Sequence, residues 1–270
     1  MDEELELLEE RLTALYKTVT KNVQAEFMAF SNSFEDAYIE MVANLSAGDI
    51  TQAEFRQWIE ANILKSEVYK ATVESMTGML VNADVAAMAI INGELPYVVA
   101  QSYNFVQSLG FAAADDAGIS VGTFQIYNAN SIEKLIKENP ELLPKPSQKT
   151  IESLGGTVSI PEDKKWNQTK INQQISQSLV RGDSIPQVAQ NLQNVTNMDE
   201  NAAIRNARMA MTCAENMGRT LSAEKLKEAG IPVNEEWSAV RDNRTRETHL
   251  LLDGTFRDKN GYFGATILDQ

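Results

Sequence analysis

The densest group of side chains that could do chemistry lies near the C-terminus, between residues 237 and 254. It contains His249, the only histidine of the chain, together with Asp242 and several closely spaced arginines. Arginines hold phosphates through paired hydrogen bonds, and a histidine beside a carboxylate can move a proton. One interpretation is therefore a phosphodiesterase or nuclease-like site, in which the candidate phosphate contacts are Arg241, Arg244 and Arg246.

The same residues fit a structural interpretation, which the sequence favours. Arg246 and His249 are three residues apart and share one face of a short helix. Asp242 precedes the expected start of that helix, where its carboxylate can accept from the first amides or pair with Arg244. Ion-pair networks of this kind often build structure, and no second acid–base pair accompanies His249. We therefore predict no catalytic residue and no enzymatic activity.

The chain is poor in metal ligands and in targeting signals. Cys213 is the only cysteine, so with His249 it cannot supply the four ligands of a structural zinc site, and we predict no metal and no cofactor. A lone cysteine forms no internal disulfide and fits a reducing compartment. The acidic N-terminus is unlike a secretory signal, and the most apolar stretch, residues 79–91, contains Asn82 and Asp84. We expect no membrane partner.

The elements that must position the C-terminal cluster are mainly helical. Apolar residues recur every three or four positions over residues 2–45, which predicts one long amphipathic helix or two in line. A further helical stretch from residue 68 is expected to end at Gly93 and Pro96, with a separate helix over residues 97–109. Farther along, helices are expected over residues 166–180 and 200–229. After them, alternation over residues 235–240 and a short helix over 245–252, closed by Gly254, predict a small α+β module.

The charge of the chain changes at a proline-rich segment. Lys and Arg number 24 against 38 Asp and Glu, a net charge of −14, and all of it lies in residues 1–162, which hold 24 acids and 10 bases. A uniformly basic nucleic-acid binder is excluded. The prolines and glycines between residues 139 and 165 favour an extended arm. We predict an acidic helical domain over residues 1–138, a linker over 139–165, and a neutral module over 166–270.

The C-terminal cluster resembles the signature of Mu F-like minor head proteins, the phage head morphogenesis family of tailed bacteriophages. The family pattern has a Trp, then D-x-R-[TV]-R-x-x-H and a D-G pair. Here the pattern runs from the Trp to the D-G pair without interruption. The matching residues are Trp237, Asp242, Arg244, Arg246, His249, Asp253 and Gly254.

Two upstream segments strengthen the resemblance, which covers residues 166–263. Residues 175–192, with Gly182-Asp183-Ser184, are similar to the family's I-x-x-x-L-x-x-G-x-S segment. Residues 203–218 resemble its A-R-T helix, with Met209 in place of the usual Thr. The family commonly continues to P-G-D-P and N-C-R-C segments that this sequence lacks, so a C-terminally shortened module is expected.

The resemblance implies a structural role. Mu F-like proteins are minor components of the procapsid that lie inside the head near the portal, and they are linked to head assembly and DNA delivery. The expected partners are the portal protein and the scaffold or major capsid protein, with a weak DNA contact through the arginine cluster around Arg244. The expected location is the capsid interior of the virion, and the host cytoplasm during assembly.

Overall fold

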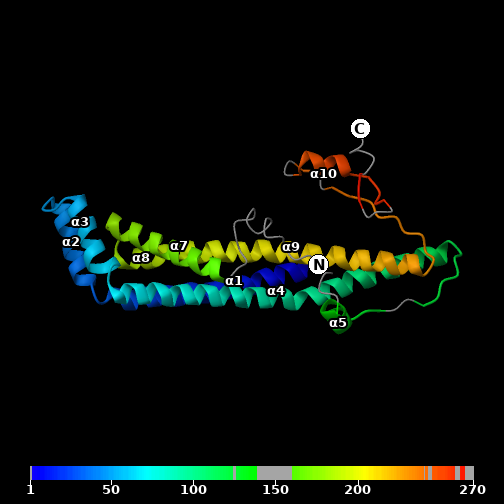
Figure 1. Ribbon diagram of the computed structural model, residues 1–270, viewed down its shortest axis with the longest axis horizontal. Coiled ribbons are helices and arrows are strands. Elements are labelled where there is room, and N and C mark those ends of the chain that lie inside the picture. Colours follow the sequence, from blue (N-terminus) through cyan, green and yellow to red (C-terminus); the bar gives the residue numbers. More distant parts are fainter. Residues whose placement is uncertain are drawn as a thin grey trace. The chain divides into compact units, whose positions relative to one another are not determined.

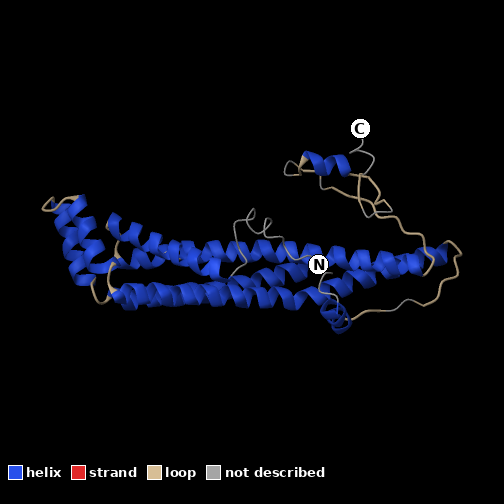
Figure 2. Cartoon of the chain, in the orientation of Figure 1, coloured by secondary structure: helices blue, strands red, loops and turns tan. Residues whose placement is uncertain are grey.

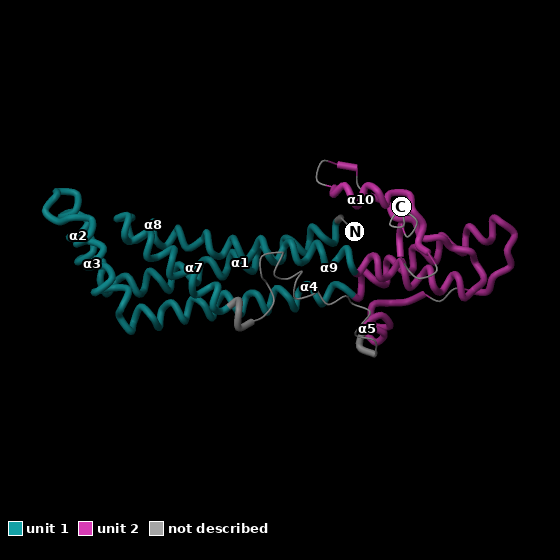
Figure 3. The backbone as a smooth tube through the Cα atoms, turned by 45° about the horizontal axis from the view of Figure 1, so that its top comes forward, with its two compact units in different colours: residues 1–95, 144–213 teal, residues 96–143, 214–270 magenta. Residues whose placement is uncertain are grey.

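The computed structural model describes residues 2–123, 126–138, 160–239, 241–242, 245–258 and 262–264. These residues are mainly helical, as predicted (Figure 2). The chain forms two compact units (Figure 3): unit 1 comprises Met1–Leu95 and Pro144–Cys213, and unit 2 comprises Pro96–Leu143 and Ala214–Gln270. Each unit combines two segments that are separated in the sequence. The sequence segments 1–138, 139–165 and 166–270 divide the chain differently, and they stay a prediction.

The helices are labelled in Figure 1 in chain order. Their bounds are α1 (Asp2–Ser31), α2 (Glu35–Ala47), α3 (Gln52–Ile59), the π-helical segment η1 (Glu60–Leu64), α4 (Glu67–Asp116), α5 (Ala129–Glu138), α7 (Ile160–Arg181), α8 (Ile185–Asn191), α9 (Gln193–Glu228) and α10 (Glu247–Leu252). The pattern over residues 2–45 is thus two helices, α1 and α2, separated by a turn at residues 32–34.

The core of unit 1 is organised by one face of α1. Seven large apolar residues on this face are each at most 8% exposed, whereas Leu5 and Leu15, which the 3–4 spacing also includes, are half-buried. The seven residues are Leu8, Leu12, Tyr16, Val19, Val23, Phe27 and Phe30. Burying each such side chain contributes roughly 1.5–3 kcal/mol, so the stripe is a large source of stability in this unit.

Polar side chains on α1 fix its position against the neighbouring helices. The Tyr16 hydroxyl donates to a carboxylate oxygen of Asp84 on α4 at 2.6 Å. On the α9 side, the hydroxyls of Thr20 and Thr196 are 2.7 Å apart. Burial raises the pKa of Asp84 above its ordinary value, and hydrogen bonds from Tyr16 and Asn167 partly offset that rise.

Helix α4 continues through residues that were predicted to break it. The expected ends at Gly93 and Pro96 are wrong, because both residues lie inside one helix of 50 residues. A proline in a helix interior removes one backbone hydrogen bond and costs about 3 kcal/mol. The flanking residues Leu95, Val98 and Val99 are at most 6% exposed, and their packing offsets that cost.

The second long helix, α9, also starts earlier than expected. It begins at Gln193, not near residue 200, so Asp199 lies within the helix and is only 6% exposed. The predicted stop is confirmed. Gly230 adopts a left-handed φ of 83°, and the next amide, that of Ile231, donates back to the Leu226 carbonyl at 2.9 Å.

Within unit 2, α4 and α9 meet at a glycine. A Cβ at Gly218 on α9 would lie 2.5 Å from the Val99 carbonyl oxygen and 2.8 Å from the Ser102 Cβ. The two backbones can approach this closely only because residue 218 has no side chain. Farther along, Ala114, Leu226 and Ile231 form a small buried cluster.

The described residues form neither the predicted α+β module nor the predicted extended arm. In place of strands, the described part of the C-terminal region has two isolated antiparallel bridges, Glu236 with Phe256 and Arg257 with Phe263. Residues 139–159 of the predicted arm lie outside the described residues. Its last part, residues 160–165, belongs to α7, since Pro161 falls in the first turn, where a missing amide hydrogen costs nothing.

Among the described residues, α4 is also the one helix whose length and composition would let it cross a membrane. Those two criteria are met equally by the core helix of a protein that never enters a bilayer. The buried positions of α4 include Val73, Met76 and Leu80, each at most 2% exposed inside unit 1.

The close approach at Gly218 generates a test by substitution. Gly218→Ala should lower the free energy of unfolding, because the new methyl group collides with backbone atoms of α4. Gly78→Ala is the matched control, because a Cβ at Gly78 meets nothing within 4 Å. The control should gain up to about 1 kcal/mol from helix propensity. Urea titration followed by circular dichroism measures both, and a stabilised Gly218→Ala would contradict the packing.

Candidate functional site

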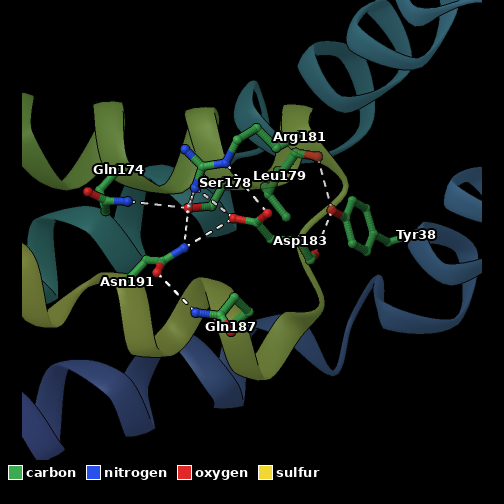
Figure 4. Close-up of polar contacts among 8 residues, drawn as sticks. All are labelled: Tyr38, Gln174, Ser178, Leu179, Arg181, Asp183, Gln187 and Asn191. Carbon is green, nitrogen blue, oxygen red and sulfur yellow. Dashed lines mark hydrogen bonds and ion pairs between the residues drawn. The ribbon is translucent and has the colours of Figure 1, made fainter.

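The region of the sequence motifs forms two separate polar clusters, one in each unit. The first lies in unit 1 where α7 ends and α8 begins, and we call the residues drawn in Figure 4 the α7–α8 clasp. Gly182 takes a left-handed φ of 80° there, and the next amide, that of Asp183, donates to the Ser178 carbonyl at 3.1 Å. This geometry ends α7 and turns the chain directly into α8.

The clasp is held by side chains from both sides of the turn. The buried Ser178 hydroxyl lies 3.1 Å from the Arg181 guanidinium and 3.1 Å from the Asn191 amide nitrogen. One carboxylate oxygen of Asp183 accepts from the same two residues, Arg181 at 2.7 Å and Asn191 at 3.1 Å. The Arg181-Gly182-Asp183 sequence is therefore an internally paired turn.

A residue from the N-terminal part of the chain completes the clasp. The Tyr38 hydroxyl, on α2, lies 3.0 Å from the Leu179 carbonyl oxygen and 2.9 Å from that of Asp183, and it donates to this pair of acceptors (Figure 4). Tyr38 is 1% exposed, and burial, aided by the Asp183 charge, raises its pKa far above the ordinary value. The raised pKa favours the neutral hydroxyl, which donates to carbonyls at the turn between α7 and α8.

The second cluster lies in unit 2 and centres on Trp237. The Trp237 amide donates to the Thr255 carbonyl at 2.9 Å, and its carbonyl accepts from the Gly254 amide at 2.9 Å. The rings of His249 and Phe263 pack edge-on against the indole, with centroids 5.7 and 5.5 Å away. Edge-to-face contacts of this kind contribute roughly 0.5–1.5 kcal/mol each, so the histidine has a packing role. We call this group the Trp237 lobe.

Asp253 ties the two sides of the Trp237 lobe together. Its carboxylate accepts from the Ala239 amide at 2.9 Å and from the Arg241 guanidinium at 2.8 and 2.7 Å. These hydrogen bonds, the Ala239 amide first, hold the pKa of Asp253 below its ordinary value. Next to it Glu235 pairs with Arg257 at 2.9 Å, so the carboxylates of the lobe neutralise its arginines.

The structure brings together part of the predicted motif cluster. Trp237, His249, Asp253 and Gly254 lie in the lobe, and Gly254 has the left-handed φ of 79° expected after the short helix. Asp242 instead binds Thr245, which donates to its carboxylate at 3.1 Å and to its carbonyl at 3.2 Å.

The two remaining motif arginines contribute less. Arg246 is the exposed N-cap residue of α10, with its side chain outside the lobe's hydrogen bonds that the structure describes. Arg244 lies outside the described residues. Within the described ranges, no group of three or more His, Cys, Asp or Glu side chains is arranged to hold a metal ion.

The comparison with known families decides what this region is. The model described as Phage Mu protein F like protein matches residues 169–261, about a third of the chain. Residues 169–261 are a phage Mu F-like segment. The match lies within residues 166–263, so the resemblance seen in the sequence is confirmed. No curated protein and no solved structure matches the chain significantly.

The Mu F-like segment contains one functional feature that the motif analysis missed. The clasp uses Ser178, Asp183 and Asn191, of which the motif names only Asp183, in the Gly182-Asp183-Ser184 segment. The available signal was Ser178 itself, a polar residue one step from Leu179 on the apolar face of α7. Nothing in the spacing pointed to Tyr38, because its acceptors are 141 and 145 residues away.

The clasp predicts a specific cost for losing one hydroxyl. Tyr38→Phe removes the hydroxyl that donates to the Leu179 and Asp183 carbonyls. The Leu179 carbonyl keeps the Gly182 amide as a donor at 3.0 Å, so the free energy of unfolding should fall by about 1–2 kcal/mol. Tyr262→Phe is the matched control, since Tyr262 is 69% exposed, and it should change stability by less than about 0.5 kcal/mol. Urea-induced unfolding measures both, and equal effects would contradict the role of Tyr38.

The lowered pKa of Asp253 predicts a pH dependence for the Trp237 lobe. Its charged form stabilises the lobe above the ordinary Asp pKa of about 3.9, and this contribution is lost as the pH falls through the lowered value. Asp253→Asn should therefore speed amide hydrogen exchange in residues 235–258 at neutral pH, and the difference from the parent should shrink at acidic pH. The exposed Glu247→Gln is the control. Unchanged protection in Asp253→Asn at neutral pH would contradict this role.

Proposed function

We propose that the protein is a minor head protein of a tailed bacteriophage or prophage that acts through protein–protein contacts. The Mu F-like match over residues 169–261 carries the proposal, because it belongs to a family of phage head morphogenesis proteins. The finer assignment extends that role to a component of the procapsid near the portal, with a part in genome delivery. Its partners would be the portal protein and the scaffold or major capsid protein.

The electrostatics of the Trp237 lobe support protein contacts over DNA contacts. Arg241 is paired with Asp253, and Arg257 is paired with Glu235. An arginine already bound to a carboxylate gains little from a phosphate, because it must give up one charge-assisted pair to form another. The net charge of −14 adds repulsion to any polyanion. A weak DNA contact is left to the exposed Arg246 and its neighbours.

The alternative function, a phosphodiesterase or nuclease, is not favoured by any contact in the described residues. His249 packs on Trp237, and the carboxylate of Asp242 accepts from Thr245. These contacts match the structural interpretation of the motif, in which the histidine and the carboxylates hold a short helix in place.

Co-purification tests the proposal directly. After induction of the phage or prophage, the protein should be found in proheads and virions, and an affinity-tagged copy should retain the portal or capsid protein through a high-salt wash. The tagged Asp253→Asn variant provides a matched comparison, since it weakens the lobe while leaving unit 1 intact. Absence of the protein from both proheads and virions would contradict the proposed function.

A further inference from the structure

In unit 2, the last part of α4 presents an apolar face to solvent. Phe105 is 64% exposed and Leu109 is 54% exposed, and Ala112 is exposed as well. These residues have the i, i+4, i+7 spacing that places side chains on one side of a helix. Tyr97, two turns earlier, is 46% exposed. Neighbouring exposed apolar side chains on one face mark an interaction site more often than scattered ones do.

Ile126, in the loop before α5, lies beside this face. Asn104 binds the backbone of Tyr127 twice, accepting from its amide at 2.9 Å and donating to its carbonyl at 2.6 Å. The Tyr127 ring also packs on Tyr103, with centroids 4.7 Å apart. These contacts fix the backbone next to Ile126, which is 70% exposed, beside the same part of α4. They hold the backbone of Tyr127, and with it Ile126, against α4.

The surroundings of the face are acidic. Residues 71–133 contain no Lys or Arg. Asp115 and Asp116, both exposed, end α4 on the C-terminal side of Leu109 and Ala112. On the part of α9 in unit 2, the cations are matched by acids in the pairs Arg219 with Glu215, Lys225 with Glu228 and Lys227 with Glu235. None of the ion pairs among the described residues includes Asp115 or Asp116.

We propose that this α4 face, defined by Tyr97, Phe105, Leu109, Ala112 and Ile126, binds an amphipathic helix of a partner protein whose apolar stripe is flanked by Lys and Arg. The apolar side chains supply contact area for the apolar stripe of such a helix, and Asp115 and Asp116 attract the flanking cations. A second copy of this chain is a poorer occupant, because it would bring the same carboxylates together. The inference rests on the proposed function, since it names the partner chemistry for protein–protein contacts.

The test uses the full chain and a synthetic helical probe. The probe is a fluorescein-labelled peptide of about 18 residues made of Leu and Lys, with Leu at i, i+3, i+4 and i+7 spacing. The reference is a Leu/Glu peptide with the same spacing. Fluorescence anisotropy should show binding of the Leu/Lys peptide with an affinity that falls as salt rises, and at least about tenfold weaker binding of the Leu/Glu peptide.

Substitutions locate the binding face. Phe105→Ser with Leu109→Ser, and separately Asp115→Asn with Asp116→Asn, should each weaken binding of the Leu/Lys peptide by at least about tenfold. The matched controls in unit 1 are Ile39→Ser with Val68→Ser, which are 56% and 60% exposed, and Asp36→Asn with Asp49→Asn. Circular dichroism checks that every variant keeps its helix content.

Several results would overturn the inference. Equal weakening by Asp36→Asn with Asp49→Asn would assign binding to net charge, and equal weakening by Ile39→Ser with Val68→Ser would assign it to exposed apolar residues in general. Equal binding of the Leu/Glu peptide would remove the charge argument. Concentration-dependent dimerisation abolished by Phe105→Ser with Leu109→Ser would make a second copy the occupant. Sedimentation of the protein with phosphatidylcholine vesicles that is lost in Phe105→Ser with Leu109→Ser would identify a membrane as the occupant of the face. Each result leaves co-purification with heads unaffected, so this inference and the proposed function fail separately.

Discussion

The apolar stripe of α1 is the constraint on which unit 1 depends. Its seven large side chains, from Leu8 to Phe30, cannot be exposed to water without losing roughly 1.5–3 kcal/mol each. They are buried by helices from distant parts of the sequence, and α1 packs on α8 in particular. Tyr16 with Asp84, and Thr20 with Thr196, then fix where α1 lies along α4 and α9. Burial of the apolar side chains stabilises unit 1, and the two polar pairs fix the position of α1 along α4 and α9.

The helices of the Mu F-like segment depend on helices from the N-terminal part of the chain. Its helices α7, α8 and the start of α9 are not a free-standing module, because α1, α2 and α4 complete their core and Tyr38 closes the clasp between α7 and α8. The Trp237 lobe is held by its own local contacts, with Asp253 as their centre. In the described contacts, the motif residues Trp237, His249 and Asp253 hold the lobe together.

Local patterns predicted the helices well and their ends less well. The α1 stripe and the stop at Gly230 follow from spacing and cap chemistry within a few residues. The predicted break at Pro96 failed because packing around Leu95 and Val99 outweighs a local preference. The motif residues Trp237, His249 and Asp253 lie together in the lobe. The partner of Asp242 and the Tyr38 contact depend on tertiary positions that no local signal encodes.

The packing of α1 against α9 is tested most directly by a cross-link. In a Cys213→Ser background, Thr20→Cys with Thr196→Cys should oxidise to an intramolecular disulfide, because the two hydroxyls are 2.7 Å apart. Thr20→Cys with Thr212→Cys is the control, since the second site lies about 24 Å along α9. Non-reducing electrophoresis and peptide mapping should show the bridge in the first pair only. No bridge in the first pair, or bridges only between molecules, would contradict the account.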